Sequence, residues 1–243
     1  MDIHFQEYFT YFGLSFIFGV LRYFLIAGGA YLFFWKVFSK AFSGRFILKR
    51  LPKFNPTMLF EIKQSIKSLM IFSFLGSVTL CLALKGGTLS YWDSQKYGKF
   101  YLFFSFFLLL FLHDAYFYWI HRLIHHRKLF RVFHKTHHIS RSPTPWTSYS
   151  FDVGEAFLNS LFFFLIPFLI PIYPGVLFGF FVFSLLYNVL AHLGYELYPK
   201  RMRESFLVST THHYLHHQRG NCNYGFYFRF WDKVMGTDFE QKQ

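Results

Sequence analysis

Long apolar runs separated by short polar segments dominate the chain. About 20 helical residues, rising 1.5 Å each, cross the hydrocarbon core of a bilayer. Five runs approach that length, at about residues 9–38, 62–84, 100–120, 156–172 and 176–191. Pro167 and Pro171 shorten the fourth run, so the pattern predicts four to five spans.

Polar residues inside these runs predict local features. Arg22 interrupts the first run and is expected to snorkel or to face a neighbouring helix. Glu61 and Lys63 stand at the start of the second run and predict an interfacial turn there. Only residues 173–175 separate the fourth run from the fifth, so these two are expected to form a tight helical hairpin.

Composition supports a lipid environment for these runs. Hydrophobic residues make up 53% of the 243 residues and aromatic residues 25%, with 39 Phe and 17 Tyr. A soluble domain of this size needs fewer large apolar side chains, so lipid is the expected solvent for many of these rings.

The net charge of +13 comes from basic residues whose placement indicates the orientation of the chain in a membrane rather than a nucleic-acid partner. Nucleic-acid binders cluster Lys and Arg on one groove-facing element, whereas here the basic residues lie between the apolar runs. Residues 39–67 carry seven Lys or Arg, 121–155 carry six and 196–243 carry seven, but 85–99 carry only three. The positive-inside rule therefore predicts a cytosolic C-terminus and an external N-terminus.

These features predict an all-α integral membrane helical bundle with a cytosolic, histidine-rich helical cap. Residues 1–99 are expected to supply membrane spans and a basic linker that includes Lys49, Arg50 and Lys53. Residues 100–238 would form a metal-binding domain, and residues 239–243 a tail.

Histidines carry the chemistry that the sequence offers. Of the 13 histidines, 12 lie between residues 113 and 217. The sequence contains one H-x-x-x-H, at His121 and His125, and two copies of H-x-x-H-H, beginning at His134 and His213. His192 ends the fifth run. Spacings of three and four residues place the histidines of each cluster on one helical face.

Convergent neutral imidazoles indicate a metal site. Imidazole binds Fe, Zn, Cu and Ni, and four ligands saturate a structural zinc, so nine or ten histidines favour two ions. Zinc has no redox chemistry, which favours iron and dioxygen at a membrane surface. Only Cys81 and Cys222 are present, which argues against a thiolate cluster.

Three segments together resemble the fatty acid hydroxylase superfamily, in particular its bacterial sterol-desaturase-like branch. They are residues 107–138, which contain HDAYFYWIHRLIHH, residues 192–199, HLGYELYP, and residues 209–237, which contain THHYLHH and end in WDKVMGT. The resemblance covers about residues 100–238, whereas the first 90 residues match only in being apolar. It implies a helical fold in the endoplasmic reticulum or the bacterial inner membrane, and a non-haem di-iron site that oxidises a lipid C–H bond with O2.

Carried over by position, the resemblance implies ten metal ligands: His121, His125, His134, His137, His138, His192, His212, His213, His216 and His217. Some relatives have a histidine where Asn188 stands, and many have a His-Pro pair before Glu155 where this chain has Asp152-Val153. Asp114 and Glu196 are expected to orient ligand imidazoles as supporting catalytic carboxylates, with pairing to an arginine as the alternative for Asp114.

The expected reaction is hydroxylation or desaturation of a sterol or fatty acyl lipid that enters from the bilayer. Electrons would come from a separate cytochrome b5-like or ferredoxin-like protein, because the sequence shows no dinucleotide fingerprint and no iron–sulfur motif. Two iron ions are the expected cofactor, and zinc can replace them in a purified sample. Two alternatives stay open: an ether-lipid or aldehyde-cleaving oxygenase on the same site, and a non-enzymatic metal-binding or haem-binding membrane protein.

Overall fold

Four apolar helices are long enough to cross a membrane in the computed structural model, which describes residues 5–48 and 54–239. The first runs over Phe5–Val37, as α1 (Phe5–Tyr23) followed by two π-helical segments, Phe24–Gly28 and Tyr31–Val37. The others are α2 (Pro56–Leu84), α3 (Gly98–Ile124) and α6 (Pro174–Ala191). The expected multi-pass membrane protein is confirmed.

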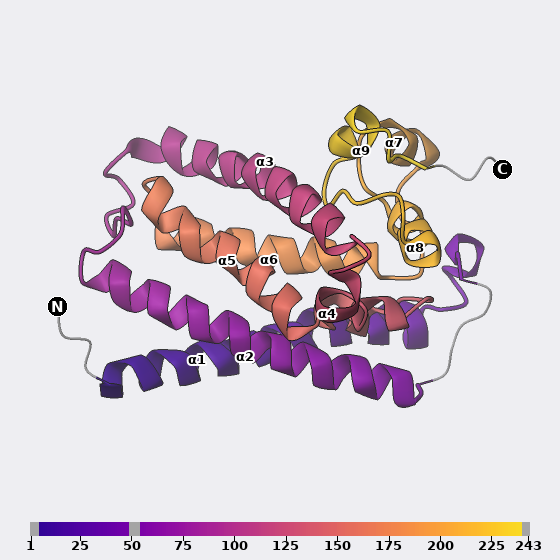
Figure 1. The fold of residues 1–243 in the computed structure, drawn as a ribbon, viewed down its shortest axis with the longest axis horizontal. Coiled ribbons are helices and arrows are strands. Elements are labelled where there is room, and N and C mark those ends of the chain that lie inside the picture. The colour runs from indigo at the N-terminus through magenta and orange to yellow at the C-terminus, as the bar shows by residue number, and fades with distance from the viewer. Residues whose placement is uncertain (1–4, 49–53, 240–243) are drawn as a thin grey trace.

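A shorter apolar helix, α5 (Val153–Leu169), precedes α6 and has Pro167 in its last turn. The Pro167 carbonyl accepts a hydrogen bond of 2.7 Å from the Leu89 amide. Only residues 170–173 join α5 to α6, and Phe163 of α5 contacts Phe181 of α6 with ring centroids 4.7 Å apart. Figure 1 shows both helices between α3 on one side and the α1–α2 pair on the other, and α5 packs against α2 and α3.

Two expectations for the long helices have clear outcomes. The interfacial turn expected near Glu61 is wrong, because α2 runs unbroken from Pro56 and the Asn55 side chain caps its first turn at the Met58 amide. Arg22 faces a neighbouring helix as expected, since its guanidinium carbon lies 4.0 Å from the ring centre of Phe181. Lys49, Arg50 and Lys53 of the predicted basic linker lie outside the described residues.

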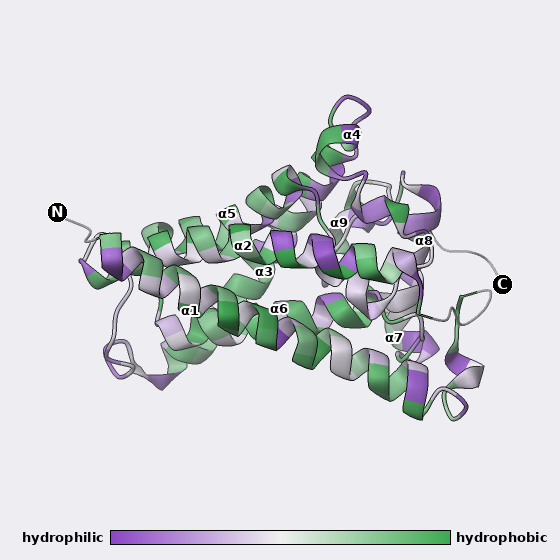
Figure 2. Ribbon diagram, turned by 90° about the horizontal axis from the view of Figure 1, so that it is seen from below, coloured by the Kyte–Doolittle hydropathy of each residue, from purple (hydrophilic) through white to green (hydrophobic). Residues whose placement is uncertain are grey.

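A polar cap gathers at one end of the bundle. It contains α4 (Phe130–Phe133), α7 (Lys200–Ser205), α8 (Thr210–Arg219) and α9 (Phe230–Val234), with 3-10 turns at His137–Ile139 and Pro145–Tyr149. Figure 2 shows hydrophobic colouring along the long helices and hydrophilic colouring around α4, α7 and α8. Within the described residues every regular element is helical, which confirms the predicted fold class.

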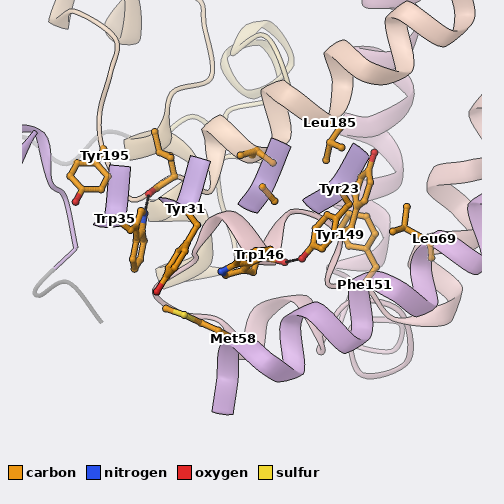
Figure 3. Packing of buried hydrophobic residues seen from close by; sticks show 14 of the residues in the cluster. Tyr23, Tyr31, Trp35, Met58, Leu69, Trp146, Tyr149, Phe151, Leu185 and Tyr195 are labelled. Carbon is orange, nitrogen blue, oxygen red and sulfur yellow. Dashed lines mark hydrogen bonds between the residues drawn. The ribbon is translucent and has the colours of Figure 1, made fainter. Parts of the chain in front are cut away.

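The main hydrophobic core joins the N-terminal helices to the rest of the chain (Figure 3). Trp146 packs against Tyr23 and Tyr31, with ring centroids 6.0 and 5.6 Å away. Leu185 of α6 belongs to the same cluster. The predicted division at residue 99 stays a prediction, although side chains from both sides of it share this core.

Candidate metal centre

Nine of the ten predicted histidine ligands lie in two groups at the cap end of the bundle. In each group every histidine offers one ring nitrogen, and these nitrogens all lie within 4.8 Å of one another. The five-histidine group comprises His121, His125, His134, His138 and His216. The four-histidine group comprises His137, His192, His213 and His217.

Each H-x-x-H-H box divides between the two groups. On α8, His213 and His217 are four residues apart and join the four-histidine group, while His216 joins the five-histidine group. Ser209 caps the start of α8 by accepting from the His212 amide, and Gly220 ends the helix with φ 72°. A short, capped helix therefore presents ligands to two neighbouring positions at once.

The expectation that the box beginning at His134 lies on one helical face is wrong. Helix α4 ends at Phe133, and residues 134–136 form a turn before the 3-10 segment His137–Ile139. The Asp152 carboxylate accepts from both the amide and the hydroxyl of Thr136 in this turn. His134 and His137 reach different groups, as His213 and His216 do on the regular helix α8.

Hydrogen bonds at Nδ1, the ring nitrogen that points away from the group, fix the tautomers of three imidazoles. Nδ1 of His121 lies 2.9 Å from the Tyr224 carbonyl oxygen, Nδ1 of His216 lies 2.7 Å from that of Cys222, and Nδ1 of His192 lies 2.8 Å from that of Asn188. A carbonyl oxygen only accepts, so each Nδ1 carries the proton and donates it. Each Nε2 then presents a lone pair towards its group, which is the form that binds a metal.

The Nε2 atoms of neighbouring histidines converge. Nε2 of His121 lies 3.0 Å from Nε2 of His134, and Nε2 of His138 lies 3.0 Å from Nε2 of His216. Nε2 of His192 lies 3.0 Å from Nε2 of His213. Nitrogens of different rings that converge in a buried site can all bind one cation through their lone pairs when each ring carries its proton on Nδ1. This donor set fits a pair of metal ions.

Glu155 is a supporting residue that the sequence assigned no role. Its Oε2 lies 2.8 Å from Nδ1 of His134, and the exposed fractions of the two side chains are only 3% and 1%. A carboxylate beside the outer nitrogen of a ligand imidazole fixes the ring and raises its basicity. The available signal was an acidic residue at the start of an apolar run, directly after a histidine-rich segment.

Burial keeps the imidazoles neutral. Desolvation lowers the pKa of His138 to about 3, with further lowering from His121 and His192. Desolvation likewise lowers the pKa of His192 to about 4, against a raising effect of its bond to Asn188. At neutral pH these rings therefore have free lone pairs for a metal.

The two predicted catalytic carboxylates contact backbone amides. Oδ1 of Asp114 accepts from the amides of Tyr227 and Phe228, at 2.8 and 3.0 Å. Glu196 accepts from the amides of Tyr198 and Thr211. Within the described residues no hydrogen bond joins either carboxylate to a grouped histidine, so any influence on the ligands passes through the backbone that each one holds.

His212 belongs to neither group. Its Nε2 lies 3.3 Å from Asp238 and 3.6 Å from Asp232. Burial raises the pKa of Asp238, but hydrogen bonds from His212 and Arg229 outweigh it, and the pKa is well below its usual range. His212 thus ties α8 to the C-terminal segment.

The segment after α8 passes close to the site at Asn223 and Gly225. Asn223 has a φ of 60°, and its side-chain amide donates to the His212 carbonyl. A Cβ on Gly225 would lie 2.5 Å from the carbonyl oxygen of Phe228, so only glycine fits there. This turn brings the Tyr224 carbonyl to His121.

An apolar cavity begins beside both histidine groups. The ring of Phe117 is 5.0 Å from that of His121, and the ring of Phe151 is 5.4 Å from that of His137. Helices α2, α3, α5 and α6, the segment before α5 and the segment between α8 and α9 supply the lining residues: Phe72, His113, Phe117, Tyr149, Phe151, Asn159, Phe163, Phe181, Ser184, Asn188 and Phe226. Most of these side chains are aromatic, so the lining of the cavity is largely apolar.

Comparisons with known proteins agree with this geometry. The model of a family described as fatty acid hydroxylase matches residues 106–237. Lathosterol oxidases of Homo sapiens and Rattus norvegicus are 32% and 34% identical to the chain over 214 residues, which cover 86% of this chain and 71% of each relative. The Delta(7)-sterol 5(6)-desaturase ERG3B of Gibberella zeae is 32% identical over 224 residues, 88% of this chain and 67% of the relative. No solved structure matches the chain.

Proposed function

Because the chain belongs to the fatty acid hydroxylase family, we propose that its two histidine groups hold two iron ions and that it desaturates a sterol with O2. The family and the relatives identify an oxygen-dependent lipid hydroxylase or desaturase in a membrane. The number of irons, the sterol and the choice of desaturation over hydroxylation are the parts proposed here. The converging Nε2 atoms beside an apolar cavity are the observation that carries them.

The nine grouped histidines are the proposed ligands, and His212 is proposed as a residue that positions α8. Bound iron would supply the oxidising chemistry: with O2, two electrons and two protons, removing two hydrogen atoms from adjacent carbons gives an alkene and two waters. The chain itself fixes several rings through their outer nitrogens, as the Tyr224 carbonyl does for His121, and Glu155 lies 2.8 Å from the outer nitrogen of His134.

The cavity walls would orient the substrate and exclude water. Seven of the eleven lining residues are Phe or Tyr, which suits a flat ring system or an apolar chain and offers few polar groups to a competing solvent molecule. Phe117 and Phe151 border the rings of His121 and His137 and would set which carbon faces the site. The relatives that act on sterols support a sterol as occupant.

A separate electron donor is proposed to dock on the cap. Exposed basic side chains surround α4, namely Arg127, Lys128, Arg131, Lys135 and Arg141. Such a surface attracts an acidic carrier of the cytochrome b5-like or ferredoxin-like kind. The excess of Lys and Arg in the same segments supports a cytosolic cap and C-terminus.

Expression in a host that accumulates a Delta(7)-sterol tests the function directly. The expected result is a new sterol with a 5(6) double bond, absent when His137 or His216 is changed to Ala. An unchanged sterol profile with folded, iron-loaded protein would rule out this substrate, and a Soret band in place of non-haem iron would rule out the site.

A further inference from the structure

A buried polar loop links the second histidine box to α5. The loop spans residues 139–151, of which residues 143–151 are all buried although four of them are Ser or Thr. It begins directly after His138 and leads to Asp152 and Glu155, which contact Thr136 and His134. The position of this loop therefore bears on ligands of both histidine groups.

Side chains from three membrane helices hold the loop backbone, and Figure 3 shows one of them, Tyr23, beside Trp146. The Tyr23 hydroxyl of α1 donates to the Trp146 carbonyl at 2.8 Å, and the Ser65 hydroxyl of α2 donates to the same oxygen at 3.2 Å. The Asn188 amide of α6 donates to the Ser148 carbonyl at 2.6 Å. Buried backbone carbonyls need such donors, so the surrounding helices dictate the path of the loop.

Glu61 of α2 binds the start of the loop with both carboxylate oxygens. Oε2 accepts from the Thr144 hydroxyl at 2.7 Å, and Oε1 accepts from the Ser140 hydroxyl. Only 1% of Glu61 is exposed. Burying a carboxylate is costly, and hydrogen bonds to it are among the stronger ones, so this contact is held firmly.

We propose that Glu61 is a positioning residue for the metal centre. Ser140 lies two residues after His138, and the adjacent His137 and His138 belong to different groups. A loop released from Glu61 would therefore displace one ligand of each metal position. The inference rests on the proposed metal site, and it brings α2, which precedes the residues matched by the family model, into that site.

Two substitutions distinguish the effect of losing the hydrogen bonds of Glu61 from the effect of losing the volume of its side chain. Glu61→Met keeps a similar length but accepts no hydrogen bond from Ser140 or Thr144. Glu61→Gln keeps one carbonyl oxygen, and its amide can donate to the second hydroxyl after that hydroxyl rotates. The Gln variant should therefore restore most of what the Met variant loses.

Leu69→Ala provides a control for general loss of stability. Leu69 is also on α2, is 1% exposed, and packs in the main core without touching the loop hydroxyls. Its truncation weakens the same helix but leaves the bonds from Glu61 to Ser140 and Thr144 intact. If Leu69→Ala and Glu61→Met have similar thermal unfolding midpoints, a difference in their metal binding reports the positioning of the ligands and not the stability of the fold.

Cobalt(II) titration of the full-length, metal-free protein, followed by its visible ligand-field absorption, is the test. Loss of a contact behind metal ligands weakens metal binding about 10-fold to 100-fold, so Glu61→Met should raise the cobalt dissociation constant at least about 10-fold and shift the bands. Glu61→Gln should stay within about threefold of wild type, and Leu69→Ala should keep the wild-type spectrum.

Two results would overturn the assignment of Glu61 alone. One is a wild-type titration and spectrum for Glu61→Met, and the other is an equal loss of cobalt in Leu69→Ala. If the wild-type protein itself binds no cobalt, the proposed metal site fails and the role of Glu61 fails with it.

Discussion

His137 and His138 are neighbours in the chain but belong to different histidine groups. The ring of His137 lies 5.1 Å from that of His192, while Nε2 of His138 lies 3.0 Å from Nε2 of His216. One turn of backbone thus supplies a ligand to each metal position, and this ties the two positions together mechanically.

Substitution of these neighbours is expected to have unequal effects. His137→Ala leaves three histidines in its group, whereas His138→Ala leaves four, enough for a closed metal site. We expect His137→Ala to lose about one metal ion per chain, and His138→Ala to retain both with weaker binding. Metal analysis after dialysis measures the difference, and equal losses in the two variants would contradict the grouping.

Glu155→Gln is expected to weaken the five-histidine group. The neutral amide cannot hold the Nδ1 proton of His134 as a carboxylate does, so metal affinity should fall about 10-fold. Competition with a chelator measures that affinity. Glu7→Gln is the matched control, because Glu7 is half exposed and pairs only distantly with Lys85 at 3.9 Å. Equal affinities for the two variants would show that Glu155 does not act on the site.

The histidine boxes illustrate what sequence could and could not supply. His121 and His125 share a group as their spacing predicts, because α3 continues to Ile124 and keeps both on one face. The non-helical turn at residues 134–136 was not predictable, since Thr136 there binds Asp152, 16 residues away in the sequence. The roles of Glu61 and Glu155 could not be predicted for the same reason, because tertiary packing sets their partners and no local spacing encodes it.

Filling the cavity should stop catalysis without emptying the metal centre. Ser184→Phe places a large ring where a buried serine lines the cavity, opposite the walls that Phe72 and Phe163 provide. Overfilling excludes the substrate, so product should fall at least about 10-fold while cobalt binding stays at the wild-type level. Full product from a folded Ser184→Phe variant would place the substrate elsewhere.

Acid should destabilise the metal-free protein. The folded pKa of His192 is about 4 and that of His138 about 3, both below the ordinary 6.5, so the unfolded chain takes up protons first as the pH falls. Their contribution is complete above pH 6.5 and decreases below it, by up to about 1.4 kcal/mol per pH unit and group. Thermal unfolding midpoints from pH 8 to pH 4 should fall below about pH 6.5, and a midpoint that rises with acid would contradict buried neutral imidazoles.

Iron content of anaerobically purified wild-type protein, compared with His137→Ala, tests the central claim most directly. Two separate groups of facing imidazoles predict about two non-haem irons per chain in the wild type and about one in the variant, with no Soret band in either. A wild-type chain that holds a single iron, or a variant that holds as much iron as the wild type, would contradict two metal positions.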